Sequence, residues 1–393
     1  MVKTTSTKVS ATPSQHESLP SIPVVDAGTG GAPAVLAAAP DQASRLRETA
    51  TTFTSERVLR LGDRIARVWL GRSTSPYVTE IDRLAAAVPG PGVHALNLNY
   101  EWACTTAAAI DPDTGAARLM RVLDWDFDGL GRNLVAARHE GPTGPWIDLG
   151  WPGFAGAITI VAPGRFAAAI NQPPPRTSRL PAPAHLVASR LVMLASTAMP
   201  AAHLLRFVAE RARNFEDAQR MLADTPICLP VFFVLAGTSP DETALIERTE
   251  RRAWIHNGPI AATNHWHTPE RTADPPASPA SHERQALLAG MMDTARDLDW
   301  LVPPIVNQRT RLACEAVPST GAILAQAWES DGPATRPTRL DQPVPDQAAE
   351  FSPAGVSPRG RFRSRSSPRP RPRRSRPRSG RRAWLHRTTG AGA

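Results

Sequence analysis

The chain has 393 residues, of which 41% are hydrophobic, so it can bury one large core or two ordinary ones. Its net charge of +9 is uneven, because residues 357–393 contain thirteen arginines and no acidic residue, which leaves a net charge near −4 for residues 1–356. No apolar run reaches the roughly 18 residues that a membrane-spanning helix needs. The composition therefore argues against an integral membrane protein.

The cysteine pattern argues against a disulfide-stabilised or Cys-pair metal protein. Cys104, Cys228 and Cys314 are odd in number and widely spaced, with no C-x-x-C pair. The N-terminal residues contain no apolar segment of the length that a secretory signal requires. These features predict a reduced, cytoplasmic protein.

The two ends of the chain differ in composition from its middle. Residues 1–40 are rich in Ser, Thr, Pro, Ala and Gly and are predicted to be disordered, as is the Pro- and Arg-rich tail over residues 333–393. Apolar residues recur at helical spacing over residues 42–70 and again over 78–88. We therefore expect a helical segment over residues 41–103.

From Ala95 onward, short apolar runs alternate with turn signals, a pattern typical of antiparallel strands. Residues 111–115 (DPDTG) and 162–164 (APG) predict tight turns. Helices are expected over residues 184–197 and 202–222, with Asn214 capping a second short helix. Strands covered by helices predict an α+β layered domain.

The residues with the clearest chemistry lie between Asn97 and Phe127. Cys104 is followed by two threonines at the start of a predicted strand, and Arg121 and Asp124 lie on the next strand. A thiolate is a strong nucleophile, and a nearby cation lowers the pKa of a thiol. Taken alone, such a cysteine is more often a buried apolar residue.

Five motifs in the same order strengthen the catalytic interpretation. They are NLNYE before ACTT, RVLDWDF, WPGFAGAITIVAPGRFAAAINQ, TPICLPVFFVLAGTSPDETALIER and ATNHWH. Together they resemble the cysteine N-terminal-nucleophile (Ntn) hydrolases of the acid ceramidase and N-acylethanolamine acid amidase family, which is related to bile-salt hydrolases and penicillin V acylases. The resemblance implies a four-layer αββα sandwich, with a catalytic domain over residues 104–332.

The resemblance also implies self-cleavage and a catalytic cysteine. The chain would cut itself between Ala103 and Cys104, and the new α-amino group would act as general base for its own thiol. Such a group has a pKa near 7.7–8.0, close to the working pH that general-base catalysis favours. The α and β chains are expected to stay associated, and no metal or organic cofactor is implied.

The aspartate and the arginine of the second strand match family positions. Asp124 would orient the new amine, and Arg121 would lie beside the thiol. Positions three apart on a regular strand face opposite ways, so we expect a bulge or twist between them. An ordinary ion pair at a strand edge is the alternative, and Asp126 is a second candidate carboxylate.

Further along the chain, the resemblance assigns the oxyanion site. Asn264 would donate to the tetrahedral oxyanion, Asn171 would line the same hole, and Arg284 would stand beside them. Turn capping is the alternative for each asparagine. The position after Asn171 is usually Glu in the ceramidase and ethanolamide amidase branches, where it links maturation to acid, but it is Gln172 here.

Three histidines and one serine suggest two other kinds of site. His265 and His267 form a His-x-His pair, and with His282 they could suggest a zinc site. No third ligand, however, lies at a spacing that supports such a site. Ser239 lies in a turn signal without a G-x-S-x-G context, which favours a structural role. We treat both as alternatives to the cysteine site.

The sequence therefore predicts a self-processing amidase that cleaves the linear C–N bond of an N-acyl substrate, with a fatty-acyl, ceramide-like or N-acylethanolamine-like substrate as the best match. Relatives bind the acyl chain in a groove between the α-chain helices and the β chain. An acyltransferase of the same fold is chemically adjacent. A different hypothesis is binding of nucleic acid or an anionic surface through the arginine-rich residues 357–393.

Overall fold

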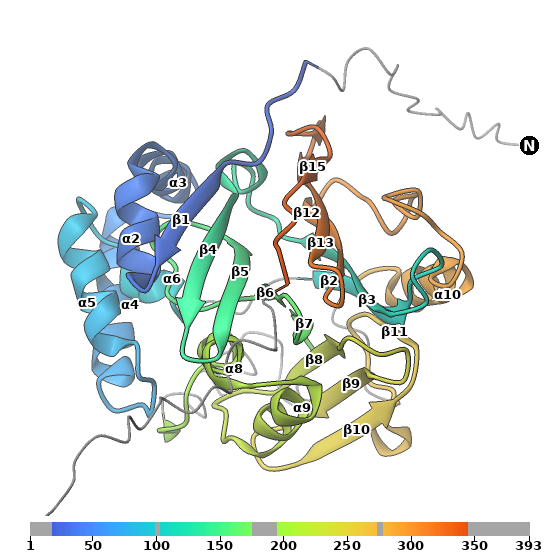
Figure 1. Cartoon of the computed structure of the whole chain (residues 1–393). Coiled ribbons are helices and arrows are strands. Elements are labelled where there is room, and N and C mark those ends of the chain that lie inside the picture. Colours follow the sequence, from blue (N-terminus) through green and yellow to red (C-terminus); the bar gives the residue numbers. More distant parts are fainter. Residues whose placement is uncertain (1–17, 99–102, 175–194, 273–277, 345–393) are drawn as a thin grey trace, which may run out of the picture. The chain divides into compact units, whose positions relative to one another are not determined.

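The computed structural model describes residues 18–98, 103–174, 195–272 and 278–344 (Figure 1). Three predictions lie outside these ranges wholly or in part. They are the disorder of residues 1–17, most of the helix expected over residues 184–197, and the arginine-rich tail with its suggested nucleic-acid binding.

Helices cluster in the N-terminal third, and strands dominate from Ala103 onward. The α-helices are α2 (Gly31–Ala38), α3 (Pro40–Phe53), α4 (Glu56–Leu70), α5 (Val78–Ala87), α6 (Val93–Leu96), α8 (Ala201–Arg211), α9 (Phe215–Asp224) and α10 (Ser281–Met291). Short 3-10 turns occur at Gly131–Asn133 and Pro269–Arg271.

The strands form two sheets. One sheet has the order β1 (Val24–Gly28), β4 (Val135–Gly141), β5 (Gly144–Gly150), β6 (Thr159–Ala162), β7 (Phe166–Asn171), β8 (Val231–Ala236), β9 (Thr243–Arg248), β10 (Ala253–Asn257). The other has the order β11 (Ile260–Ala262), β2 (Ala103–Ile110), β3 (Ala117–Asp124), β12 (Thr310–Val317), β13 (Ala322–Glu329), β14 (Gly332–Pro333), with β15 (Thr338–Arg339) also paired to β13.

The two sheets pack face to face, and helices cover both. Alternate side chains of β2 and β3, including Ala108 and Leu119, join a core shared with β7 and β8 of the other sheet. The intervening side chains, including Ala107 and Met120, pack under Leu288 of α10. Helices α8 and α9 pack on the eight-stranded sheet. These layers confirm the predicted α+β, αββα sandwich.

Strands β7 and β8 are buried along their whole length, because both faces of the sheet are covered there. This burial explains the nearly continuous apolar run VFFVLA, which does not alternate with polar residues. The expected turns are confirmed at residues 111–115 between β2 and β3 and at 162–164 between β6 and β7. Asn214 caps α9, since its side chain accepts from the backbone nitrogen of Asp217 at 2.9 Å.

The predicted domain boundaries are wrong in two places. Residues 24–38 were expected to be disordered, yet they form β1, which pairs in parallel with β4, and α2, whose Val35 is buried. Because β1 and β4 lie far apart in the chain, no local sequence pattern predicts that they pair. The domain also continues past residue 332, because β15 pairs with β13 and Leu340 is only 2% exposed.

The helix expected over residues 42–70 is two helices. Ser55 interrupts it and caps α4 by accepting from the backbone nitrogen of Val58. In the described ranges, none of the helices combines the length and the apolarity needed to cross a bilayer.

Candidate active site

Cys104 is the second residue of β2 and is completely buried. Its backbone nitrogen donates to Oδ1 of Asn264 at 3.0 Å. Its carbonyl oxygen accepts from Nη1 of Arg284 at 3.0 Å, and its thiol lies 3.3 Å from the carbonyl oxygen of Ile170. Three partners from distant parts of the chain thus fix the three polar groups of this residue.

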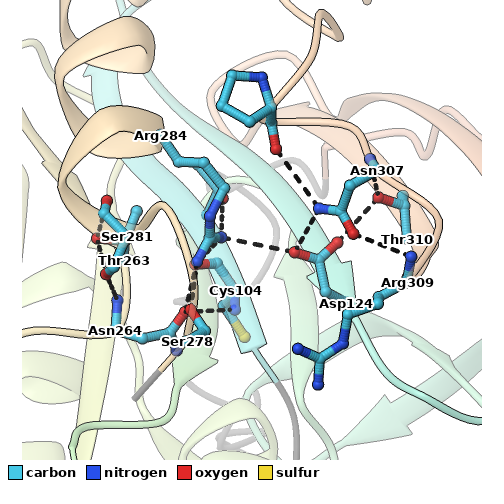
Figure 2. Close-up of polar contacts among 12 residues, drawn as sticks. Cys104, Asp124, Thr263, Asn264, Ser278, Ser281, Arg284, Asn307, Arg309 and Thr310 are labelled. Atoms are coloured by element: carbon cyan, nitrogen blue, oxygen red, sulfur yellow. Dashed lines mark hydrogen bonds and ion pairs between the residues drawn. The ribbon is translucent and has the colours of Figure 1, made fainter. Parts of the chain in front are cut away.

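Asn264 follows β11, and its side-chain oxygen is the centre of the hydrogen-bond network (Figure 2). Besides the nitrogen of Cys104, Oδ1 accepts from Arg284 at 3.1 Å and from the hydroxyl of Ser278 at 2.9 Å. Its Nδ2 donates to the backbone carbonyl of Gln172 at 2.8 Å. Segments from three of the five motifs, those of Cys104, Gln172 and Asn264, therefore meet here.

Asp124 ends β3 and is held by three groups. Oδ1 accepts from the hydroxyl of Thr310 at 2.9 Å, and Oδ2 accepts from Nδ2 of Asn307 at 3.0 Å. Oδ2 also lies 3.5 Å from Nη1 of Arg284. Figure 2 shows the guanidinium of Arg284 between Asp124 and Asn264, so this arginine links the carboxylate to the backbone of Cys104.

Arg121 reaches the site from the other face of the sheet. Its Nη1 donates to Oδ1 of Asn171 at 2.7 Å and to the hydroxyl of Thr106 at 3.1 Å, on the side that faces β7. Nε and Nη2 of Arg121 are buried and have no hydrogen-bond partner among the described residues. A buried cation with unpaired donors is poised to stabilise a thiolate.

Of the bulge or twist expected between Arg121 and Asp124, the bulge is absent. Strand β3 keeps an unbroken register with β2, and the irregularity lies instead in β12, between Thr310 and Leu312. Strand alternation therefore sends Arg121 and Asp124 to opposite faces. They flank Cys104 from two sides rather than forming a strand-edge ion pair with each other.

Burial has the largest effect on the pKa values of the Cys104 thiol and the Asp124 carboxyl. It raises the pKa of the Cys104 thiol, while the charge of Arg121 opposes the rise and that of Asp124 adds to it. Burial likewise raises the pKa of the Asp124 carboxyl, and Arg284 opposes the rise. The intact chain therefore favours a protonated thiol that needs a base.

Asn171 uses both of its amide hydrogens within the described network. Nδ2 donates to the carbonyl oxygens of Ala262 and Thr263 at 3.0 and 3.3 Å. Nδ2 of Asn264, in contrast, carries two hydrogens and donates one hydrogen bond to the described residues. Asn171 is thus in the site, while its expected part in the oxyanion hole stays a prediction.

The remaining candidates lie around this centre. Asp126 points to the surface, where it pairs with Arg309, so it is not the orienting carboxylate. His265 engages both ring nitrogens, with Ser281 at 2.9 Å and with Gln285 at 2.9 Å.

The rings of His267 and His282 lie 5.6 and 3.8 Å from the ring of His265. Within the described ranges, no cluster of three His, Cys, Asp or Glu side chains is arranged to hold a metal ion. Ser239 lies in the β8–β9 turn, where its backbone nitrogen donates to Glu242.

Sequence reasoning missed Ser278, Asn307 and Thr310. Ser278 lies in a Pro-rich stretch that contains none of the five motifs, yet its hydroxyl is buried against Asn264. Asn307 and Thr310 have no motif of their own and reach Asp124 only because β12 pairs with β3. Both are polar residues at or just before the start of a buried strand, and this was the one feature of the sequence that could have pointed to them.

An apolar cavity of about 540 Å³ lies between the N-terminal helices and the strand domain. Trp125, which directly follows Asp124, lines it together with Trp151. Helices α3 and α4 supply the opposite wall, including Ala50 and Ile65. The residue that follows Asp124 in the chain is therefore part of the cavity wall, whereas Asp124 and Cys104 themselves do not line it.

Comparison with known proteins agrees with the motif analysis. No family model matches the chain. Acid ceramidase of Heterocephalus glaber is 24% identical over 220 residues, which cover 51% of this chain and 54% of that protein. The chain thus spans about half the length of this curated relative. The predicted resemblance to acid ceramidase is confirmed at the level of sequence.

Solved structures show weaker likeness. The Caenorhabditis elegans ortholog of N-acylethanolamine-hydrolyzing acid amidase has a TM-score of 0.45 and 16% identity, covering 60% of this chain and 100% of its own. A mutant conjugated bile acid hydrolase from Clostridium perfringens has a TM-score of 0.38 and 10% identity, covering 61% and 92%. Penicillin V acylase from Agrobacterium tumefaciens has a TM-score of 0.34 and 13% identity, covering 56% and 82%.

Proposed function

We propose that this chain is a self-processing cysteine amidase that hydrolyses the linear C–N bond of an N-acyl substrate through a thioester on Cys104. The single observation that carries the proposal is the hydrogen bond from the nitrogen of Cys104 to Asn264, in a network that also holds Asp124 through Arg284. Every buried backbone nitrogen needs a hydrogen-bond partner, and the partner here is a side-chain amide rather than a carbonyl of a neighbouring strand.

Self-cleavage would begin with attack of the Cys104 sulfur on the carbonyl carbon of Ala103. The C–N bond between them breaks, the nitrogen takes the thiol proton, and a thioester remains. Water then hydrolyses the thioester, which leaves a carboxylate on Ala103 and restores the thiol. The nitrogen that Asn264 accepts from becomes the free α-amino group, and Oδ1 can hold it after cleavage.

Amide hydrolysis would use the same atoms. The α-amino group takes the thiol proton, the sulfur attacks the substrate carbonyl carbon, and the departing amine receives that proton. Water then releases the acid from the thioester. We assign the oxyanion donor to the second N–H of Asn264, a contribution on the order of a few kcal/mol.

The cavity supports an apolar acyl group. Its walls are almost entirely hydrophobic, and Trp125, next to Asp124 in the chain, is one of the residues that line it. A volume of about 540 Å³ lies in the range of small-molecule sites, so a fatty-acyl chain fits better than a compact polar group.

Hydrolysis of N-acyl amines of increasing chain length tests this proposal. We expect kcat/KM to rise with acyl length in the wild-type protein. Ala50→Trp should fill part of the cavity and lower kcat/KM for long acyl chains about tenfold or more, with little effect on short ones. Glu48→Trp, on the exposed side of α3, is the matched control. Equal loss for all chain lengths would place the acyl group elsewhere, and recovery of transferred product rather than free acid would indicate an acyltransferase.

A further inference from the structure

Arg47 of α3 lines the apolar cavity, and it is the one ionisable residue among the described residues of the cavity wall. Helix α3 turns one face toward the cavity, since Ala43, Ala50 and Thr54 lie four, three and seven positions from Arg47 and line it too. A guanidinium held against apolar side chains loses part of its hydration, so its N–H groups need other partners.

The guanidinium of Arg47 finds few such partners within the protein. Nη2 donates to Oε1 of Glu56 at 3.3 Å, a long contact between side chains that are 30 and 46% exposed. Nε is buried and has no hydrogen-bond partner among the described residues. Because a guanidinium carries five N–H donors, Arg47 keeps donors for a ligand.

Glu56 does not neutralise this part of the cavity wall. Its other oxygen, Oε2, pairs with Arg60, one turn further along α4. Arg47 and Arg60 thus share a single carboxylate, and the three side chains together carry one excess positive charge. Ion pairs between exposed side chains are weak. An incoming anion can therefore take the place of Glu56 on Arg47.

A glycine allows the guanidinium to lie close against the cavity wall. Gly90, in the turn after α5, has a φ of +89°, and a β-carbon there would lie 2.7 Å from Nε of Arg47. Glycine is the residue that accepts both this backbone conformation and so close an approach. Val88 and Pro91, on either side of Gly90 in the chain, also line the cavity. The turn therefore supports the cation at the wall.

We propose that the cavity binds a long-chain carboxylate, with its alkyl chain against the apolar walls and its carboxylate on Arg47. A guanidinium can hold a carboxylate through two parallel hydrogen bonds. A carboxylate also brings one negative charge, which equals the excess positive charge at this part of the wall. A phosphate monoester would add nearly a second charge and a third acceptor oxygen, and the described wall holds no further cation to compensate them.

A free fatty acid is the form of this ligand that the proposed reaction would release. Its binding requires no turnover, so the site itself does not depend on the amidase proposal. One consequence does rest on that proposal: the released acid would occupy the cavity that receives the next acyl group, and it would inhibit hydrolysis competitively. Glu56 would then be the internal carboxylate that the acid displaces from Arg47.

Isothermal titration calorimetry of the full chain tests the site with dodecanoate, dodecanol and dodecylammonium, below the concentrations at which they form micelles. We expect dodecanoate to bind about tenfold more tightly than dodecanol, because hydrogen bonds to charged groups are the stronger ones. Dodecylammonium should bind most weakly. Arg47→Gln should weaken the binding of dodecanoate about tenfold and leave that of dodecanol nearly unchanged.

Two further variants and a control sharpen the test. Arg47→Lys should keep part of the preference for dodecanoate, since lysine retains the charge but not the two-pronged geometry. Glu56→Gln should tighten the binding of dodecanoate about two- to fivefold, because it removes the competing carboxylate of an exposed ion pair. A purely structural role of Arg47 does not predict this gain. Arg83→Gln, at an exposed position of α5 outside the cavity wall, is the matched control.

Two results would overturn the proposal. Equal affinity of the wild type and Arg47→Gln for dodecanoate would assign its binding to other arginines, such as those of residues 357–393. Equal losses for dodecanoate and dodecanol in Arg47→Gln, with no gain in Glu56→Gln, would show that Arg47 shapes the wall and does not bind the anion.

The titration and an amidase assay can fail independently. A chain that hydrolyses N-acyl amines but binds dodecanoate no better than dodecanol would overturn the carboxylate site and leave the amidase proposal intact. A chain that binds dodecanoate through Arg47 but hydrolyses no N-acyl amine would support the site and contradict the amidase proposal.

Discussion

Oδ1 of Asn264 accepts a hydrogen bond from the backbone nitrogen of Cys104 at 3.0 Å, across 160 positions of sequence. The same amide donates from Nδ2 to the carbonyl of Gln172. In the proposed mechanism, one side chain thus holds the nitrogen that would become the catalytic base and would also donate to the reacting carbonyl.

Replacing Asn264 by alanine removes both functions. We predict that Asn264→Ala lowers kcat on the order of 10²-fold or more, with a smaller change in KM, because the lost donor acts on charge that develops in the transition state. Steady-state kinetics of the processed enzyme measure this. Ser239→Ala, in a distant turn, is the control, and an effect confined to KM would contradict the oxyanion role.

Arg121 should set the pH at which the thiol reacts. Burial raises the pKa of Cys104, and the Arg121 cation opposes that rise, so its removal leaves the thiol harder to ionise. We predict that Arg121→Gln moves the rising limb of the pH–rate profile to higher pH. Arg138→Gln, on the exposed side of β4, should leave the profile in place. Identical profiles for wild type and Arg121→Gln would show that this cation does not act on the sulfur.

Gln172 predicts maturation without acid. Glutamine is nearly isosteric with protonated glutamic acid and does not ionise near neutrality, so cleavage at Ala103–Cys104 should proceed at roughly pH 7 to 8. Gln172→Glu should shift cleavage to lower pH, because an ionised carboxylate at this position would first have to be neutralised. The cleaved fraction measured against pH for both proteins tests this. Coincident curves would remove position 172 from control of maturation.

Asp148 should make stability depend on pH. It is buried on β5, its Oδ1 has no hydrogen-bond partner among the described residues, and burial raises its pKa to about 7. A carboxyl whose folded pKa lies above its unfolded value stabilises the fold at low pH and loses that contribution as pH rises through about 7.

The consequence can be measured by urea unfolding at roughly pH 5 and pH 9. We predict that Asp148→Asn loses less stability than the wild type between these values, by about 2–4 kcal/mol, because asparagine cannot ionise. Asp113→Asn, at an exposed turn, is the control. Parallel losses in the wild type and Asp148→Asn would contradict the assignment.

Local signals predicted the elements whose information lies within a few residues. The DPDTG turn joins β2 to β3, and Asn214 caps α9, because turn and cap chemistry is set by neighbouring residues. Strand β1 was missed because its stability comes from parallel pairing with β4, more than a hundred residues away. A composition rich in Pro, Ala and Gly also made this part of the chain resemble a disordered segment.

The site residues also fall into those that the sequence could indicate and those that only the folded chain brings together. Cys104 and Asn264 could be assigned because each lies in a motif, and Arg284 because of its place a short way after Asn264; the structure brings all three into contact. Ser278 and Asn307 could not, since their roles arise only from the closing of loops and strands around the site.

The intact mass of the purified protein tests the central claim most directly. The account predicts two associated chains for the wild type, the second beginning at Cys104, and a single inactive chain for Cys104→Ala. A wild-type protein that remains one chain and still hydrolyses N-acyl amines at the normal rate would contradict it.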